Sequence, residues 1–128
     1  MKFKFSLIIP AYNSESTLRA LLNSVNQQTY ENDFETIVVD DCSTDGTCDV
    51  CHALEIRPCR LENNRGPAHC RNLGAGNATG DILVFTDSDC IVAQDWLEQL
   101  ERSFEQLDAE VIMGRLVLLP SGYLGDSI

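Results

Sequence analysis

Short apolar runs of strand length recur along the chain, separated by polar or helical stretches. They lie at Phe3–Pro10, Phe34–Val39, Ile82–Thr86 and Glu110–Leu119, with a weaker run at Ile56–Leu61. Continuous apolar runs of this length are typical of strands that are buried on both faces of a sheet. Pro58 interrupts the weakest run, and because proline is confined to sheet edges we place that strand near an edge.

Between these runs, apolar residues recur at the spacing of helices. One face is made of Leu18, Leu21, Leu22 and Val25, a short helix is marked by Val50, Ala53 and Leu54, and another face by Trp96, Leu97, Leu100, Phe104 and Leu107. Pro67 and Gly80 suit the start and the end of a further helix running to about Ala78. We expect Asn13 or Ser14 to cap the first helix, because their side-chain oxygens can accept from free backbone amides.

The alternation of strands and helices predicts an α/β fold. Strands joined by helices form a mostly parallel, Rossmann-like sheet with helices on both faces. The 128 residues suffice for one domain, which we assign to residues 1–128. Ligands of such sheets bind beyond the carboxyl ends of the strands.

The charge of the chain narrows the possible functions. Its net charge of −11 argues against non-specific nucleic-acid binding, which needs a basic surface, and against docking to anionic lipids. An anionic ligand would need a divalent cation or focused arginines at its site. No apolar run approaches the ~20 residues of a spanning helix. We expect a cytoplasmic location, and peripheral membrane contact stays open for a longer full-length protein.

Three polar clusters follow three of the predicted strands, at Pro10–Glu15, Asp40–Thr47 and Asp87–Asp89. Parallel topology would bring all three to one rim of the sheet. Neighbouring carboxylates there require a cation, and Mg²⁺ or Mn²⁺ held by one or two carboxylates plus ligand phosphates is the usual partner. Each cluster alone could instead be a helix cap or a solvated loop, since D-x-D is a weak pattern.

These clusters and their neighbours carry the motifs of a known family. The matching segments are Leu7–Asn13, Ser24–Tyr30, Val38–Thr47, Asn64–Asn72 and Phe85–Asp89, with Trp96 and Leu97 after the last. The third segment is close to the signature V-D-D-G-S-T-D-G-T. Over nearly its whole length the chain resembles the family-2 glycosyltransferases, which implies the GT-A fold.

The resemblance implies nucleotide-binding roles for the first two clusters. The pocket for the base and the ribose would be lined by Pro10, Ala11, Tyr12 and Asn13. Asp41 would accept from the base, which suits an acceptor-only carboxylate, and Asp40 would support the same loop. Glu15 matches the family motif too, although it could simply favour the first helical turn through the helix dipole.

The resemblance also implies a metal and diphosphate site around the third cluster. Asp87 would lie near the ribose and the metal, Ser88 would contact the nucleotide-sugar, and Asp89 would hold the Mg²⁺ or Mn²⁺ that bridges the phosphates. Arg65 or Arg71 would contact the base or a phosphate, for which the arginine fork is suited. A salt bridge to an acidic residue is an equally open role for either arginine.

The family places its general base and acceptor-binding elements after the strand that Glu110–Leu119 resembles. Only Pro120–Ile128 follow here, and Asp126 sits in no matching motif, so we assign no catalytic base. We expect either a piece of a longer protein or a truncated, inactive copy, with no glycosyl transfer by these residues alone. We also expect the uncovered apolar run Glu110–Leu119 to make the chain self-associate.

Cysteines supply the rival interpretation. Cys48–His52 spells C-x-x-C-H, a pattern of c-type haem attachment, and Cys59, His69 and Cys70 could complete a zinc site instead. The alternative is that Cys48 and Cys51 are ordinary small apolar residues, one helical turn apart, in a reducing compartment. Cys42 stands where the family prefers glycine, so it is open whether its loop can adopt the positive φ that glycine tolerates.

The leading hypothesis is a domain that binds a nucleoside-diphosphate sugar with a divalent metal, for inverting transfer of the sugar to an acceptor hydroxyl. UDP is the default nucleotide, and the acceptor is undetermined. A non-catalytic nucleotide-binding remnant is the first alternative, and a cysteine/histidine metal or haem protein is the second.

Overall fold

The computed structural model describes residues 3–107 and 112. In chain order its elements are β1 (Phe5–Ala11), α1 (Glu15–Asn26), β2 (Phe34–Asp40), α2 (Thr47–Ala53), β3 (Cys59–Arg60), α3 (Pro67–Asn77), β4 (Ile82–Phe85) and α4 (Trp96–Gln106). The strand predicted at Glu110–Leu119, and the self-association based on it, lie outside the described residues. Within the described ranges, no helix is long and apolar enough to cross a membrane.

The strands form one parallel sheet in the order β3-β2-β1-β4. β1 pairs with β2 along its whole length, from Phe5 opposite Phe34 to Ala11 opposite Asp40. β3 is only two residues long and lies at an edge, as the position of Pro58 predicts. The parallel order brings the carboxyl ends of β1, β2 and β4 to the same side of the sheet.

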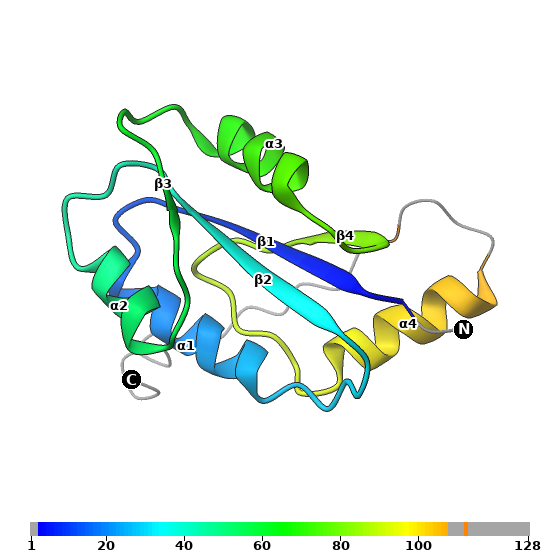
Figure 1. Ribbon diagram of the computed structural model, residues 1–128. Helices are drawn as coiled ribbons and strands as arrows, with labels where there is room; N and C mark the ends of the chain where they lie inside the picture. Colours follow the sequence, from blue (N-terminus) through cyan, green and yellow to red (C-terminus); the bar gives the residue numbers. More distant parts are fainter. Residues whose placement is uncertain (1–2, 108–111, 113–128) are drawn as a thin grey trace.

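Helices cover both faces of the sheet, which confirms the predicted α/β architecture (Figure 1). α3 lies over one face and packs on β1 and β2, while α1, α2 and α4 lie on the opposite side. β1 is central, and all seven of its residues are buried. This burial on both faces explains why the sequence of β1 is continuously apolar instead of alternating.

The main core lies between β1 and α1. Leu7 and Ile9 of β1 pack in one cluster with residues of the predicted apolar helix face, Leu18, Leu21, Leu22 and Val25. Ile8 points the other way, toward α3, because successive strand residues face opposite sides. Burial of each of these aliphatic side chains contributes about 1.5–3 kcal/mol.

The first helix begins where the sequence predicts, but the expected capping bond is absent. Ser14 occupies the N-cap position, yet its hydroxyl makes no side-chain cap hydrogen bond. Asn13 is diverted as well, since its Oδ1 accepts from the Thr44 amide at 2.8 Å. The prediction of side-chain capping is therefore wrong, because both side chains bond to neighbouring loops instead.

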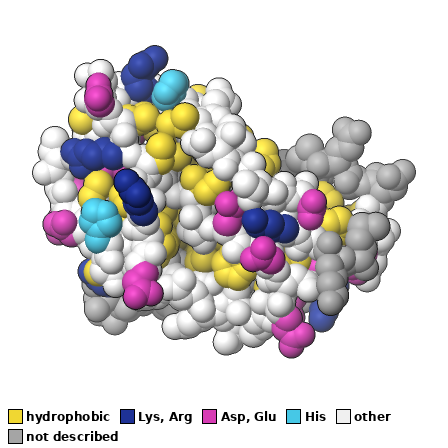
Figure 2. All heavy atoms as spheres, viewed as in Figure 1, with side chains coloured by type: hydrophobic (Ala, Val, Ile, Leu, Met, Phe, Trp, Pro, Cys, Tyr) yellow, Lys and Arg dark blue, Asp and Glu magenta, His cyan; other side chains and the backbone are white. Residues whose placement is uncertain are grey.

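Charged side chains are spread over the surface. On the face shown in Figure 2, Lys and Arg side chains are interspersed with Asp and Glu side chains. The chain carries 20 acidic residues against 9 basic ones. An anionic ligand is therefore repelled by the molecule as a whole unless a cation or a local arginine offsets the carboxylates.

Candidate functional site

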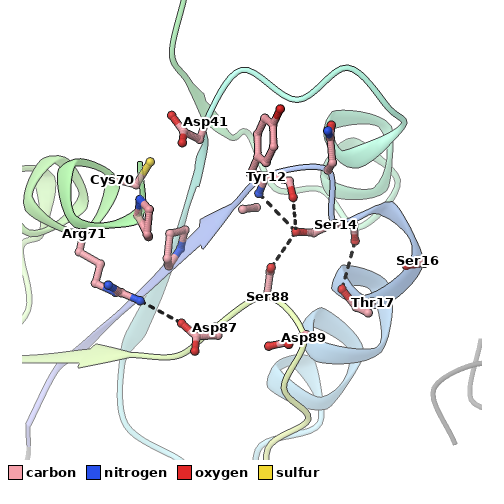
Figure 3. A pocket seen from close by; sticks show the side chains of 14 residues that line it. Tyr12, Ser14, Ser16, Thr17, Asp41, Cys70, Arg71, Asp87, Ser88 and Asp89 are labelled. Carbon is pink, nitrogen blue, oxygen red and sulfur yellow. Dashed lines mark hydrogen bonds and ion pairs between the residues drawn. The ribbon is translucent and has the colours of Figure 1, made fainter. Parts of the chain in front are cut away.

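A cavity of about 500 Å³ opens beyond the carboxyl ends of the strands. It is lined by residues of all three polar clusters and of α1 and α3, namely Pro10, Ala11, Tyr12, Asn13, Ser14, Ser16, Thr17, Asp41, Pro67, Cys70, Arg71, Asp87, Ser88 and Asp89. Figure 3 shows Asp41, Cys70 and Arg71 on one side and Ser14, Ser16 and Thr17 on the other. The size is that of a small-molecule site.

The structure brings nine of the twelve predicted site residues to this cavity and leaves three outside it. Those that line it are Pro10, Ala11, Tyr12, Asn13, Asp41, Arg71, Asp87, Ser88 and Asp89. Those that do not are Glu15, Asp40 and Arg65. Convergence of the clusters follows from the parallel sheet, whereas the division between the two groups depends on side-chain direction.

Asp41 is the buried carboxylate of the cavity wall. It is 3% exposed, and its two oxygens accept from the amides of Arg65 at 2.7 Å and Gly66 at 2.9 Å. Gly66 has φ +92°, a conformation that glycine adopts without strain. Each carboxylate oxygen keeps a further lone pair, so Asp41 can accept from a ligand while it holds this loop.

Cys70 lies beside Asp41 in the cavity wall. Burial, followed by the charge of the neighbouring Asp41, raises the pKa of the Cys70 thiol to about 11. The thiol is therefore protonated at neutral pH and serves as a small apolar wall group.

Asp40 lies behind the cavity, fully buried. One of its oxygens accepts from the Ser43 hydroxyl and from the Ser43 amide at 3.2 Å. The other accepts from the Cys48 thiol at 2.7 Å and from Arg60 Nη1 at 3.2 Å. These four donors compensate the burial of the charge, and the carboxylate fixes the loop that follows β2.

Glu15 and its neighbours join the first cluster to the second. Glu15 Oε2 accepts from the Gly46 amide at 3.2 Å, and the Glu15 amide donates to Asp45 Oδ2 at 3.3 Å. Next to them, the Asn13 amide donates to the Ser43 hydroxyl at 2.9 Å. Burial alone would raise the pKa of Asp45, but hydrogen bonds from Thr47 and from the Glu15 amide outweigh it and lower that pKa. Glu15 therefore connects the segment after β1 to the loop after β2, outside the cavity.

The two candidate arginines, Arg65 and Arg71, lie differently relative to the cavity. Arg71, on α3, lines the cavity and forms an ion pair with Asp87 at 3.1 Å, the two side chains being 39% and 64% exposed. Arg65 contributes its backbone amide to Asp41, and its side chain does not line the cavity. Only Arg71 is thus placed to contact a ligand in the cavity.

Sequence reasoning missed five residues that line the cavity, namely Ser14, Ser16, Thr17, Pro67 and Cys70. Ser14 lies within the cluster Pro10–Glu15, Ser16 and Thr17 follow it in the first turn of α1, and helix N-termini favour anions. Their position at a helix N-terminus could therefore have identified them as site residues from the sequence. Pro67 and Cys70 lie within the matched segment Asn64–Asn72 and face the cavity from the first turns of α3.

The loop after β2 adopts a left-handed backbone at Cys42. Its φ is +62°, in the region that glycine adopts freely and other residues rarely do. The Cys42 thiol donates to the Glu62 carbonyl at 3.4 Å. The loop thus keeps a glycine-like conformation although a cysteine occupies the position.

The donor atoms at the cavity suit a hard divalent cation. Asp87 and Asp89 both line it, and two carboxylates completed by ligand phosphates are a common arrangement for Mg²⁺. Among the described residues, no group of three or more His, Cys, Asp or Glu side chains is assembled to hold a metal alone. The residues present therefore fit a cation that the ligand helps to bind.

Among the described residues, the cysteines and histidines are not assembled into a zinc site. All six cysteines are free, and both histidines lie in the described ranges without joining a metal-ligand group there. Cys51 is fully buried in the core, and burial raises its pKa to about 11, which disfavours the thiolate that a metal needs. The structure supports the packing interpretation for Cys51, whereas Cys48 is half-buried and its thiol donates to Asp40 at 2.7 Å.

Comparison with known proteins identifies the class. The family model described as Glycosyl transferase family 2 matches residues 6–122. The chain belongs to this family, and its fold is GT-A.

Several relatives illustrate the similarity. The glycosyltransferase YfnE of Bacillus subtilis is 40% identical over 115 residues, which cover 87% of this chain and 29% of that protein. The structure of Staphylococcus aureus TarS 1–349 in complex with UDP has a TM-score of 0.76 and 36% identity, covering 80% of this chain and 32% of that one. TarS has also been solved with UDP-GlcNAc. The mannosyltransferase PcManGT of Pyrobaculum calidifontis, in complex with GDP-Man and Mn²⁺, has a TM-score of 0.73 and 28% identity, covering 86% of this chain and 34% of that one. The chain thus spans about a third, or less, of the length of these relatives.

Proposed function

We propose that this chain is the donor-binding part of a glycosyltransferase that transfers a sugar with inversion from a nucleoside diphosphate to an acceptor hydroxyl. The observation that carries the proposal is the convergence of Asp41, Arg71, Asp87 and Asp89 on one cavity at the carboxyl ends of the strands. The complexes of TarS with UDP and of PcManGT with GDP-Man and Mn²⁺ support a nucleotide-sugar and a divalent metal as the ligands.

One set of cavity residues would bind the base and ribose, and another would bind the metal and diphosphate. Asp41, held by two backbone amides, would accept from an N–H of the base, while the chain from Pro10 to Asn13 would enclose the base and ribose. Asp87 and Asp89 would hold Mg²⁺ or Mn²⁺ against the diphosphate. Bound there, the cation would stabilise the negative charge that gathers on the leaving nucleoside diphosphate.

Arg71 would exchange its partner when the donor binds. In the structure its guanidinium neutralises Asp87, and a cation at Asp87 would release it toward a phosphate or the base in the same cavity. We take UDP as the default nucleotide. We assign no general base, because attack by an acceptor hydroxyl needs a carboxylate within reach of that hydroxyl and the acceptor is unidentified.

The test is calorimetry of the chain with UDP and with GDP, in Mn²⁺ and in EDTA. We expect binding of at least one nucleotide to depend on Mn²⁺. Asp89→Asn should lower the affinity in Mn²⁺ by about tenfold or more, the loss typical of damaged metal sites. Asp41→Ala should weaken binding by about tenfold in both buffers, because its contact does not involve the metal.

Asp49→Asn is the matched control, since it removes the same charge from an exposed position on α2 that does not line the cavity. It should bind as the wild type does. Thermal melting of each variant without ligand shows whether it is folded. Equal nucleotide affinity of the wild type in Mn²⁺ and in EDTA would contradict the metal's role.

A further inference from the structure

Ser14 departs from the usual behaviour of a serine that precedes a helix. At the N-cap, a serine hydroxyl normally accepts from the amide two or three residues later. The Ser14 carbonyl accepts from the amides of Thr17 at 3.1 Å and Leu18 at 2.9 Å, as an N-cap carbonyl ordinarily does, but the Ser14 hydroxyl makes no capping bond. Because Ser14 lines the cavity and lacks the usual capping bond, its hydroxyl is free to serve the site instead of the helix.

The hydroxyl instead reaches a residue 74 positions away. Ser14 Oγ lies 2.7 Å from Ser88 Oγ, which joins the loop after β1 to the segment after β4 (Figure 3). Ser14 is 7% exposed, and its amide donates to Thr47 Oγ1 at 2.9 Å. Its hydroxyl also lies 3.2 Å from the Tyr12 carbonyl, to which it donates. Ser14 is therefore held in place by Thr47 and Tyr12, and its hydroxyl contacts Ser88.

The segment Asp87–Asp89 has few other side-chain anchors among the described residues. Asp87 is paired with Arg71, but both side chains are substantially exposed, and exposed ion pairs constrain geometry weakly. The Asp89 side chain has no hydrogen bond or ion pair within the described part of the chain, and a backbone bond from the Cys90 amide to the Asp87 carbonyl closes the turn at 3.2 Å. The hydroxyl pair is thus the best-shielded anchor of the two carboxylates.

The hydroxyl protons decide the direction of the hydrogen bond between Ser14 and Ser88. Each serine has one hydroxyl proton. When Ser14 donates to the Tyr12 carbonyl, Ser88 donates to Ser14, and the orientation of Ser88 is then set. Because Ser88 lies between Asp87 and Asp89 in the chain, fixing Ser88 fixes the backbone from which both carboxylates project.

We propose that Ser14 is a positioning residue of the donor site, whose hydroxyl holds Ser88 and thereby sets the spacing of Asp87 and Asp89 for a divalent cation. The proposal rests on the proposed metal-dependent binding of a nucleoside diphosphate. Ser14 itself would not contact the cation. Its effect would reach the metal through Ser88, as the outer hydrogen-bond partners of metal ligands commonly act.

The experiment compares Ser14→Ala, Ser88→Ala and the double variant with the wild type. The affinity for UDP or GDP, whichever the wild type binds more tightly, is measured by calorimetry in Mn²⁺ and in EDTA. We expect Ser14→Ala to lower the affinity in Mn²⁺ by roughly tenfold and to leave the affinity in EDTA within about twofold. The double variant should keep the same metal-dependent affinity as Ser88→Ala, because Ser14 would act on the metal only through Ser88.

Two further variants separate positioning from folding. Ser14→Gly removes the same hydroxyl but keeps a residue that helix N-caps tolerate well, so it should reproduce Ser14→Ala. Ser103→Ala removes a serine hydroxyl of α4 outside the cavity and should change neither affinity nor thermal stability.

Every result of these measurements either supports or overturns the positioning role of Ser14. Ser14→Ala with wild-type affinity in Mn²⁺ would overturn the positioning role, as would an equal loss in Mn²⁺ and EDTA, which a purely structural residue would give. If the wild type itself gains no affinity from Mn²⁺, the proposed function fails together with this inference. If the wild type gains affinity and Ser14→Ala keeps that gain, only the inference about Ser14 fails.

Discussion

At the scale of single residues, Cys42 shows how the loop after β2 is specified. The loop must turn so that Asp41 faces the cavity while Asp40 stays behind it, and Cys42 provides this turn with a φ of +62°. A left-handed conformation costs a residue with a Cβ about 1–2 kcal/mol. The thiol bond to the Glu62 carbonyl is weak compensation.

We therefore predict that Cys42→Gly stabilises the protein. The expected gain in the free energy of unfolding is up to about 1 kcal/mol, because relief of the backbone exceeds the entropy that glycine gains in the unfolded chain. Urea denaturation measures it. Cys42→Ala, which loses the thiol but keeps the strained φ, is the control and should show no gain. A Cys42→Gly variant less stable than the wild type would show that the entropy of glycine and the lost thiol contact together outweigh the backbone strain.

At the scale of elements, α3 is set against the sheet by one close approach. A Cβ at Gly74 would lie 2.5 Å from Ile8 Cγ2 and 3.4 Å from Val39 Cγ2, and Ile8 is fully buried in β1. Only a glycine lets the helix lie this near. The approach matters for the site because α3 carries Cys70 and Arg71 to the cavity.

Two glycines of α3 give a matched pair of substitutions. Gly74→Ala should lower the free energy of unfolding by about 1–3 kcal/mol, as overpacking of a core does. Gly76→Ala meets nothing within 4 Å and should instead raise it by up to about 0.5–1 kcal/mol, because alanine favours helix. Thermal or urea unfolding of both variants is the measurement, and a similar effect of the two would argue against the close contact with Ile8.

At the scale of the whole molecule, the two ends of the sheet have different tasks. The carboxyl ends of the strands form the cavity. Near the opposite end, Glu35 Oε2 accepts from the Ser6 hydroxyl at 2.5 Å and from the Thr79 amide at 2.7 Å, which ties β1 and β2 to the turn before β4. The hydrogen bond from Ser6, followed by that from the Thr79 amide, lowers the pKa of Glu35 to about 2.

This tie predicts a pH dependence of stability. Because the pKa of Glu35 is lower in the folded state than its ordinary value of 4.5, its contribution is fully present above pH 4.5 and is lost as the pH falls toward 2. Glu35→Gln should lower the free energy of unfolding at pH 7 on the order of 1 kcal/mol, since the partly exposed side chain is screened by solvent. It should also flatten the loss between pH 4.5 and 2.

Urea unfolding across this pH range measures the effect, with Glu31→Gln, an exposed carboxylate in the neighbouring loop, as the control. Nucleotide affinity at pH 7 should be unchanged in both variants, because the cavity lies at the other end of the strands. A Glu35→Gln protein that keeps the full acid sensitivity of the wild type would refute the assignment.

The sequence by itself determined the order of the elements, the parallel α/β architecture and the convergence of three polar clusters on one rim. These follow from local features that a linear pattern carries. Apolar runs of strand length define β1, β2 and β4, helical spacing defines α1 and α4, and parallel connections place the strand ends together. The edge position of β3 followed in the same way from Pro58.

The family resemblance already separated Asp41, expected to face the base, from Asp40, expected to support the loop, and the structure adds that Asp40 is fully buried behind that loop. For the other candidates, only the tertiary structure decided which side chains face the cavity. The Arg71 side chain lines the cavity, whereas Arg65 contributes only its backbone amide, which donates to Asp41. The Ser14 hydroxyl contacts Ser88 instead of capping α1. The physical reason is that the direction of a side chain depends on hydrogen-bond partners far away in sequence, and these are assembled only when the sheet and its loops have folded.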